Sequence, residues 1–143
     1  PAFANREKRM GADAVRNTVG RYCQFLDDGR IDDVAALFAE NGVLDIAAFG
    51  IKQQGRAAIA AQLRQTSRPE TKGVHSTFNP VIEVSGDAAT GSFDYVWIDF
   101  SGAPRIGLGG RYVFKLVRSA QSWLIEEMKV ELRSDPSHIS LSA

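Results

Sequence analysis

Apolar residues near the start of the chain recur with the period of an α-helix. Four of them follow one another at steps of four, three and four residues: Val15, Val19, Tyr22 and Leu26. This spacing places them on one stripe of a helix that packs against a core. The pattern predicts a helix over residues 11–28 that ends at Asp28-Gly29, because glycine tolerates the left-handed conformation that follows a helix. Residues 1–10 are mostly polar and are expected to form an arm or the first loose turn of this helix.

Shorter elements are predicted between this helix and residue 73. An amphipathic pattern predicts a helix over residues 31–40, and an alanine-rich stretch predicts another over residues 56–65. Between these two helices, residues 43–47 and 51–54 have strand-like patterns on either side of Phe49-Gly50. This arrangement favours a β-hairpin.

From Gly73 onwards the apolar pattern changes to the two-residue period of β-strands. Long strands are predicted over residues 74–84, 88–100, 106–118 and 122–132, separated by turn residues. In the second and third of these strands, large side chains share one face and form a wall: Phe93, Tyr95, Trp97, Ile106, Leu108, Tyr112, Phe114 and Leu116. Three helices followed by a meander of strands predict an α+β fold whose sheet curls over the helices. Residues 134–143 are expected to be a flexible tail.

Composition narrows the class of protein. A chain of 143 residues fits one domain, residues 1–143. The 17 Lys and Arg residues balance the 17 Asp and Glu residues, which argues against nucleic acid or an anionic membrane as the main partner. No apolar run approaches the ~20 residues that a membrane-spanning helix needs. The single Cys23 excludes an internal disulfide, so a reducing cytoplasm is the expected location.

Several stretches carry a resemblance to a known family. These are RYCQFLDDGRIDDVAALFAENGVLDI, GRAAIAAQL, HSTFNPVIEVSGDAATGSFDY and GGRYVFKLVRSAQSWLIEEM. Together they resemble the SnoaL-like branch of the nuclear transport factor two-like superfamily, over residues 12–133. The resemblance implies a conical α+β barrel in which three helices pack on a strongly bent mixed sheet around a deep apolar pocket. The reaction is not implied, because the same fold hosts dehydratases, isomerases, cyclases, an epoxide hydrolase and non-catalytic binding domains.

The resemblance also points to a pair of polar residues. Scytalone dehydratase and hexachlorocyclohexane dehydrochlorinase are similar in pairing an Asp at the end of the first helix with a His near the start of the first long strand. The matching positions are Asp27 and His75. In such a pair a neutral imidazole removes a proton, while the carboxylate fixes its tautomer and stabilises the imidazolium. The resemblance therefore implies His75 as general base and Asp27 as its orienting carboxylate. Tyr22 matches the oxyanion-hole Tyr of ketosteroid isomerase in position, and is a candidate hydrogen-bond donor.

Each of these residues also has a purely structural interpretation. Asp27 can simply end its helix, although the helix dipole disfavours an acid there. His75 shares a strand face with Thr77 and Asn79, a pattern that is also typical of a solvated face. Tyr22 can be a core aromatic residue whose hydroxyl finds a local partner.

Other positions depart from the relatives. Leu26 stands where the dehydratase has a Tyr that holds water, and Gly107 stands near the position of its second His. The base Asp of ketosteroid isomerase falls on Ile46, and Asp45 points to the opposite face of the strand. No relative's substrate is therefore carried over to this chain.

Three functions stay open from the sequence. The first is a cofactor-free lyase or isomerase, dehydratase-like, that acts on a small, mostly apolar cyclic or aromatic molecule. We expect no metal, because the sequence has no cluster of His and carboxylate residues. The expected substrate-binding residues are Phe49, Tyr95, Trp97, Leu108 and Tyr112. The second function is a non-catalytic small-molecule-binding domain, and the third is an epoxide-type hydrolase that uses Asp99 and Arg111. The resemblance also implies a homodimer or higher homo-oligomer formed through the outer face of the sheet.

Overall fold

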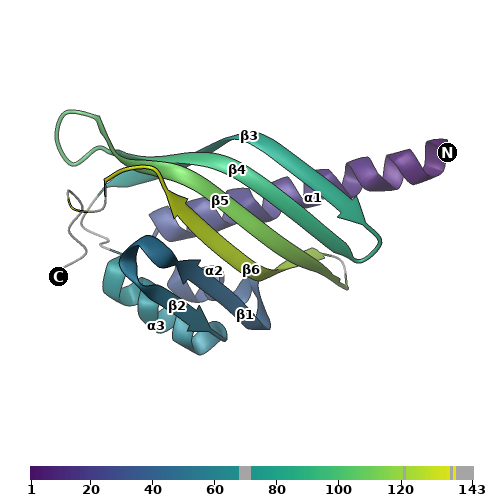
Figure 1. The fold of residues 1–143 in the computed structure, drawn as a ribbon, viewed down its shortest axis with the longest axis horizontal. Helices are drawn as coiled ribbons and strands as arrows, with labels where there is room; N and C mark the ends of the chain where they lie inside the picture. The colour runs from purple at the N-terminus through teal and green to yellow at the C-terminus, as the bar shows by residue number, and fades with distance from the viewer. Residues whose placement is uncertain (68–71, 121, 136, 138–143) are drawn as a thin grey trace.

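The computed structural model describes residues 1–67, 72–120, 122–135 and 137, and it shows three helices packed on one curved sheet (Figure 1). The helices are α1 (Ala2–Asp27), α2 (Ile31–Ala36) and α3 (Arg56–Thr66), with a 3-10 turn η1 (Ala47–Phe49). The strands are β1 (Phe38–Ile46), β2 (Ile51–Gln54), β3 (Gly73–Ser85), β4 (Ala88–Asp99), β5 (Arg105–Ser119) and β6 (Ser122–Leu132). The α+β class predicted from the sequence is confirmed.

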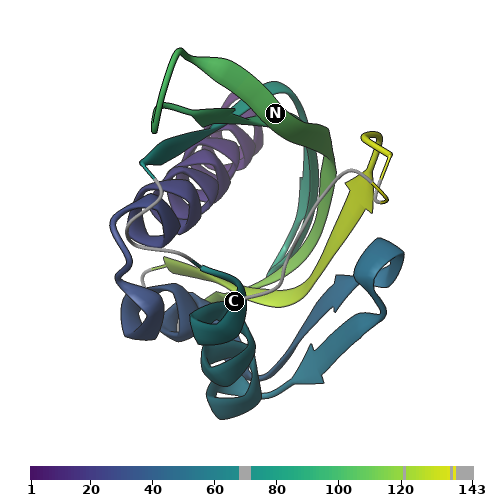
Figure 2. The ribbon, with the colours of Figure 1, turned by 90° about the vertical axis from the view of Figure 1, so that its left-hand side faces the viewer.

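The strands form one six-stranded sheet in the order β2-β1-β6-β5-β4-β3. Only β1 and β6 pair in parallel, and the other neighbours are antiparallel. Figure 2 shows the long strands curving around α1, while α2 and α3 lie together beside β1. The core therefore fills the concave side of the sheet.

Helix α1 presents its predicted apolar stripe to this concave side. Val15, Val19 and Tyr22 are buried there, and α1 packs mainly against β3. The helix ends as the sequence predicts: Gly29 adopts a positive φ of 70°, and its N–H donates to the carbonyl of Leu26. The next N–H donates to a carbonyl five residues back, which completes a Schellman cap. This cap fixes the place where α1 stops, one residue before the C-cap Asp28.

Two helix boundaries differ from the sequence prediction. Helix α1 begins at Ala2, so the predicted arm at residues 1–10 is helical, and Figure 1 shows its first turns projecting beyond the hairpin between β3 and β4. Helix α2 ends at Ala36, and the predicted helical residues 38–40 belong to β1. Phe38 is fully buried and pairs with Ile125 of β6. A pairing partner that lies so far along the chain overrides the local helical pattern.

The remaining elements lie close to their predicted positions. The strands predicted at 74–84, 88–100, 106–118 and 122–132 correspond to β3, β4, β5 and β6. Most of the predicted tail at 134–143 lies outside the described residues. None of the described helices combines the length and the apolar character that a membrane span requires.

Candidate active site

Asp27 and His75 are in direct contact. Asp27 is the last residue of α1, and His75 lies near the start of β3. The ring Nδ1 of His75 lies 2.5 Å from Oδ1 of Asp27. The backbone N–H of His75 also donates to the same carboxylate, at 2.9 Å to Oδ2 and 3.2 Å to Oδ1. Both side chains are largely buried, with 18% of the His75 side chain and 13% of the Asp27 side chain exposed.

This geometry indicates which ring nitrogen of His75 carries the hydrogen. An ionised carboxylate can only accept hydrogen bonds, so the Nδ1 atom that faces Asp27 carries the hydrogen. The Nε2 atom of a neutral His75 is then left with a free lone pair, as a general base requires. The same hydrogen bonds compensate Asp27 for its unfavourable place at the negative end of the helix dipole.

The three tyrosines of the chain lie on the concave side of the sheet. Tyr95 stacks on Tyr112 with ring centroids 3.9 Å apart, and Tyr22 meets Tyr112 edge-on at 5.9 Å. Burial raises the pKa of Tyr95 to about 12, and burial also raises the pKa of Tyr22 and of Tyr112 above the usual value. All three phenols therefore keep their protons at neutral pH and can donate hydrogen bonds.

Trp97 lies beside His75. The two residues are directly opposite each other on β4 and β3, and their ring centroids are 6.5 Å apart. The indole occupies space that a side chain on either of two glycines would need: a Cβ atom at Gly73 would lie 2.2 Å from its Nε1, and one at Gly107 would lie 2.4 Å from its Cε3. The indole is thus held against the backbone of β3 and β5. The sequence shows these glycines, but their common partner appears only once the strand register is known.

The glycine-rich part of β5 contains a bulge. The pairing of β4 with β5 shifts register after Trp97, which leaves Gly107 without a partner opposite it. Leu108 pairs with Trp97 and is half-buried. Phe49 lies in η1, which joins β1 to β2 at the opposite edge of the sheet from β3. The structure therefore brings Leu108 close to Trp97, but it does not place Phe49 beside His75 in the sheet.

The residues of the hydrolase alternative do not pair with each other. Arg111 contacts Asp94 at 2.8 Å, whereas Asp99 contacts Arg105 at 2.9 Å and accepts two hydrogen bonds from Ser101. Asp94 and Asp99 are an odd number of residues apart on β4, so they point to opposite faces of the sheet. The geometry gives no Asp99–Arg111 site.

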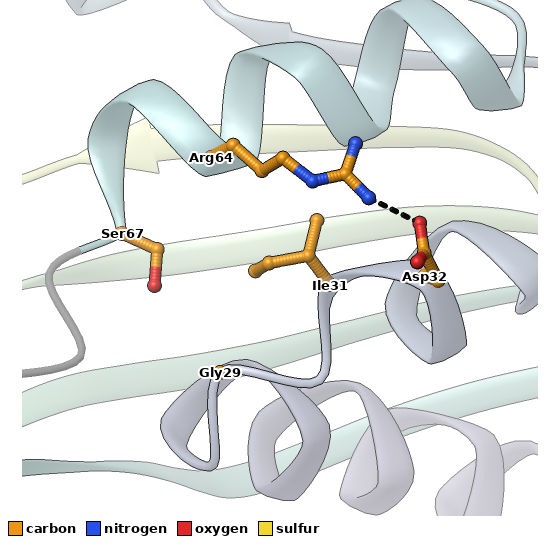
Figure 3. Close-up of a pocket in the computed structure, with 5 residues that line it drawn as sticks. All are labelled: Gly29, Ile31, Asp32, Arg64 and Ser67. Atoms are coloured by element: carbon orange, nitrogen blue, oxygen red, sulfur yellow. Dashed lines mark hydrogen bonds and ion pairs between the residues drawn. The ribbon is translucent and has the colours of Figure 1, made fainter.

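Two cavities are lined by residues other than Asp27 and His75. One has a volume of about 290 Å³ and lies between the turn after α1 and the end of α3 (Figure 3). It is lined by Gly29, Ile31, Asp32, Arg64 and Ser67, and Arg64 forms an ion pair with Asp32 across it. The other, about 470 Å³, is lined by residues of β3, β4 and β5 and by Arg133 and Ser134. Neither of these two cavities is the deep apolar pocket that the resemblance implies. Within the described part of the chain, no three His, Cys, Asp or Glu residues are grouped so that they could hold a metal ion.

The fold identifies the family of proteins to which this chain belongs. Three N-terminal helices on a strongly curved mixed sheet form a cystatin-like domain of the nuclear transport factor two-like superfamily. The SnoaL-like domain matches residues 11–129, and the chain belongs to this family. No curated protein matches the chain in sequence.

Solved structures are similar in fold. A protein of unknown function from Mycobacterium tuberculosis has a TM-score of 0.77 and 25% identity, over 87% of this chain and 72% of the other. A nuclear transport factor two-like protein from Novosphingobium aromaticivorans has a TM-score of 0.78 and 22% identity, over 93% and 86% of the two chains. A candidate scytalone dehydratase from the same organism has a TM-score of 0.74 and 22% identity, over 85% and 83%.

Proposed function

We propose that this protein is a cofactor-free lyase or isomerase that removes a proton from a small, mostly apolar cyclic or aromatic substrate. The observation that carries the proposal is the contact of His75 Nδ1 with Asp27 at 2.5 Å, supported by the backbone N–H of His75 on the same carboxylate. This contact leaves Nε2 available as the base. The similarity in fold to a candidate scytalone dehydratase is consistent with this reaction class.

The proposed reaction begins with transfer of a C–H proton to Nε2 of His75. The electron pair of that C–H bond moves into the substrate, where it either expels a leaving group on the neighbouring carbon or shifts a double bond. In the first case the product is an alkene and the imidazolium gives its proton to the leaving group, and in the second the imidazolium returns the proton to a different carbon. Asp27 stabilises the imidazolium while it exists, and Tyr22 donates a hydrogen bond to any oxyanion that develops.

Most of the side chains proposed to contact the substrate are aromatic. Trp97 is held next to His75 by its contacts with two glycine backbones, and it is partly exposed. Tyr95 and Tyr112 continue the same concave face, and Leu108 lies opposite Trp97. Flat rigid rings favour a flat apolar substrate, because they contact it over a large area and lose little side-chain freedom. Phe49 is no longer included in this wall, since η1 lies at the other edge of the sheet.

A non-catalytic small-molecule-binding domain is the second candidate. It is favoured by one observation: the two cavities of about 290 Å³ and 470 Å³ are not lined by Asp27 or His75. A ligand in either cavity would therefore bind mainly to other residues than the proposed base.

One experiment separates the two functions. A collection of apolar ring compounds is screened by thermal shift, since any ligand that prefers the folded state raises Tm. Each hit is then followed for chemical change with the wild-type protein and with His75→Ala and Asp27→Asn. The enzyme proposal predicts turnover that both substitutions abolish. Turnover that persists in both variants, or tight binding without any chemical change, contradicts it.

We also propose that the protein associates with a second copy of itself through the outer face of β3, β4 and β5. This face exposes large apolar side chains, among them Val74, Phe78 and Ile106, which are 43–67% exposed. Exposed apolar side chains gathered on one sheet face are typical of a protein interface.

A further inference from the structure

The cavity of about 470 Å³ opens on the outer face of the sheet, away from the concave face that holds the candidate active site. Tyr95 is buried on the concave side, so its neighbours along β4, Asp94 and Val96, point outward. Phe78 of β3 and Arg111 of β5 lie directly opposite Asp94, and their side chains share its outward direction. The size of this cavity is typical of a small-molecule site.

Two glycines of β5 keep the cavity open. Gly109 and Gly110 line it with backbone, and Gly109 lies opposite Val96 of β4. A Cβ atom at Gly109 would lie only 3.2 Å from Cγ1 of Val96, so the absence of a side chain leaves room on the outer face at this point. Phe78 and Ile106 add apolar side chains to the lining, and they are 43% and 67% exposed. The cavity therefore combines a flat stretch of backbone with apolar walls.

Arg111 is held in place at this cavity by an acid. Its Nε donates to Oδ1 of Asp94 at 2.8 Å, and Asn79 donates to Oδ2 of the same carboxylate at 3.0 Å. The hydrogen bonds from Asn79 and Arg111 keep the pKa of Asp94 below its usual range, so Asp94 stays ionised and holds the guanidinium. The terminal nitrogens of Arg111 have no partner among the described residues, and their N–H groups can donate to a ligand.

Arg133 brings a second positive charge to the cavity. Its backbone N–H donates to the carbonyl of Gly109 at 2.9 Å, which fixes it beside the glycines. Its side chain is exposed and forms no ion pair within the part of the chain that the structure describes. Arg111, Arg133 and Asp94 are the charged residues of the lining, so the described lining has an excess of one positive charge. A single carboxylate on a ligand would balance it.

We infer that this outer cavity binds a small aromatic carboxylate. The flat ring of the ligand lies on the backbone of Gly109 and Gly110, beside Phe78, and its carboxylate meets the free N–H groups of Arg111 and Arg133. A guanidinium binds a carboxylate through two parallel hydrogen bonds, which favours a carboxylate over a neutral group of the same shape. A rigid ring also loses little conformational freedom when it binds.

The test compares two probes that have the same rings but differ in charge: 2-naphthoate and its neutral analogue 2-naphthamide. Dissociation constants of both are measured by calorimetry at neutral pH for the wild type, Arg111→Gln and Arg133→Gln. We expect the wild type to prefer 2-naphthoate by about tenfold or more, and each substitution to reduce that preference about tenfold, as the loss of one charged hydrogen bond would. Arg133→Gln is the decisive variant, because it breaks no side-chain contact among the described residues.

Lys115→Gln is the matched control. Lys115 lies four residues along β5 from Arg111 and shares its outward direction, but it does not line the cavity. Its substitution removes the same charge from the same face and should leave the preference unchanged. Phe78→Ala should weaken both probes alike, since it removes only apolar contact. No detectable binding of 2-naphthoate, equal affinity for the two probes, or a preference that survives in both arginine variants would overturn the inference.

A second copy of the chain is the rival occupant of this cavity, because Phe78 and Ile106 also belong to the face proposed for self-association. A ligand and a second copy would then compete for these side chains. Sedimentation is therefore measured with and without saturating 2-naphthoate. Binding to a monomeric protein, or a shift of an assembly towards the monomer, supports the inference. An assembly that excludes 2-naphthoate overturns it.

His75→Gln separates this site from the proposed reaction. His75 lies opposite Trp97 of β4, on the concave side of the sheet, so its substitution should leave the affinity for 2-naphthoate unchanged. Loss of 2-naphthoate binding in His75→Gln would place the ligand on the concave side and overturn the outer site, without contradicting the proposed base. Retained binding together with loss of turnover in the same variant supports both sites independently.

Discussion

His75 supplies every hydrogen bond that the structure shows on the carboxylate of Asp27. Its ring contacts Oδ1 at 2.5 Å, and its backbone N–H reaches both oxygens at 2.9 and 3.2 Å. These hydrogen bonds join the end of α1 to the start of β3, and all of their donors belong to His75. A contact of this kind fixes the imidazole in position as well as in tautomer, because the ring and the backbone that carries it are attached to the same group.

Asp27→Asn is expected to impair catalysis without changing the fold. An amide can present an N–H to Nδ1 and so permit the wrong tautomer, and it has no charge to stabilise the imidazolium. We expect turnover of a substrate identified by the thermal-shift screen to slow by roughly 100-fold or more. Asp28→Asn is the matched control, because Asp28 is the exposed neighbour at the C-cap. Equal slowing in both variants would show that helix-end charge, and not the contact with His75, is responsible.

Substitution of the two glycines under Trp97 is expected to displace the indole. A Cβ atom at Gly73 or Gly107 would lie 2.2–2.4 Å from indole atoms. We expect Gly107→Ala to lower the free energy of unfolding by about 1–3 kcal/mol, the usual cost of overpacking, and to weaken the binding of flat ligands. Urea unfolding and near-ultraviolet circular dichroism measure the two effects. Gly102→Ala is the control, since a Cβ atom there would meet nothing within 4 Å. A stable Gly107→Ala with an unchanged tryptophan signal would contradict the packing described for Trp97.

Alkaline pH is expected to destabilise the fold, because the buried thiol of Cys23 and the buried phenol of Tyr95 then lose their protons more easily in the unfolded chain. Burial raises the pKa of Cys23 from 9.0 to about 12, with a smaller contribution from Asp27, and burial raises the pKa of Tyr95 from 10.0 to about 12. In the unfolded chain these groups lose their protons first, so the folded state is favoured below pH 9 and loses this advantage as pH rises towards 12. Urea unfolding over this range should show a falling free energy of unfolding, with a shallower fall for Tyr95→Phe. The same slope in both proteins would contradict the burial of the Tyr95 hydroxyl group in a low-dielectric site.

Self-association is expected to depend on the outer face of the sheet. Ile106 is 67% exposed there, and a charge at this position should prevent a second copy from covering it. Analytical ultracentrifugation should find a dimer or larger assembly for the wild type and a monomer for Ile106→Asp. Met10→Asp serves as control, because Met10 is also exposed but lies on α1. A monomeric wild type, or loss of association in both variants, would refute the proposed interface.

Local patterns in the sequence were sufficient for most of the architecture. The apolar stripe of α1 and the stop at Gly29 depend on neighbouring residues, and both are confirmed. Residues 38–40 were predicted wrongly as helix, because their state depends on pairing with β6 far along the chain. Residues 2–10 were predicted as an arm or one loose turn, and not as the regular helix that they form, since they are exposed and carry no apolar stripe.

The candidate site was predictable only in part. Asp27 and His75 were paired from a resemblance, and their contact follows from how α1 ends and β3 begins. The contact of Trp97 with Gly73 and Gly107 could not be foreseen, because it depends on the register of three strands and on the bulge at Gly107. The meeting of the three tyrosines depends on the same register and on the position of α1 over the sheet.

The tautomer of His75 tests the account most directly. The protein is labelled with nitrogen-15 in its two histidines, and long-range proton–nitrogen correlation spectra are recorded at neutral pH, with His75→Gln used to assign the signals. The account predicts that the neutral form of His75 carries its hydrogen on Nδ1 and a free lone pair on Nε2, and that Asp27→Asn removes this preference. A hydrogen fixed on Nε2, or a tautomer mixture that Asp27→Asn does not alter, would contradict it.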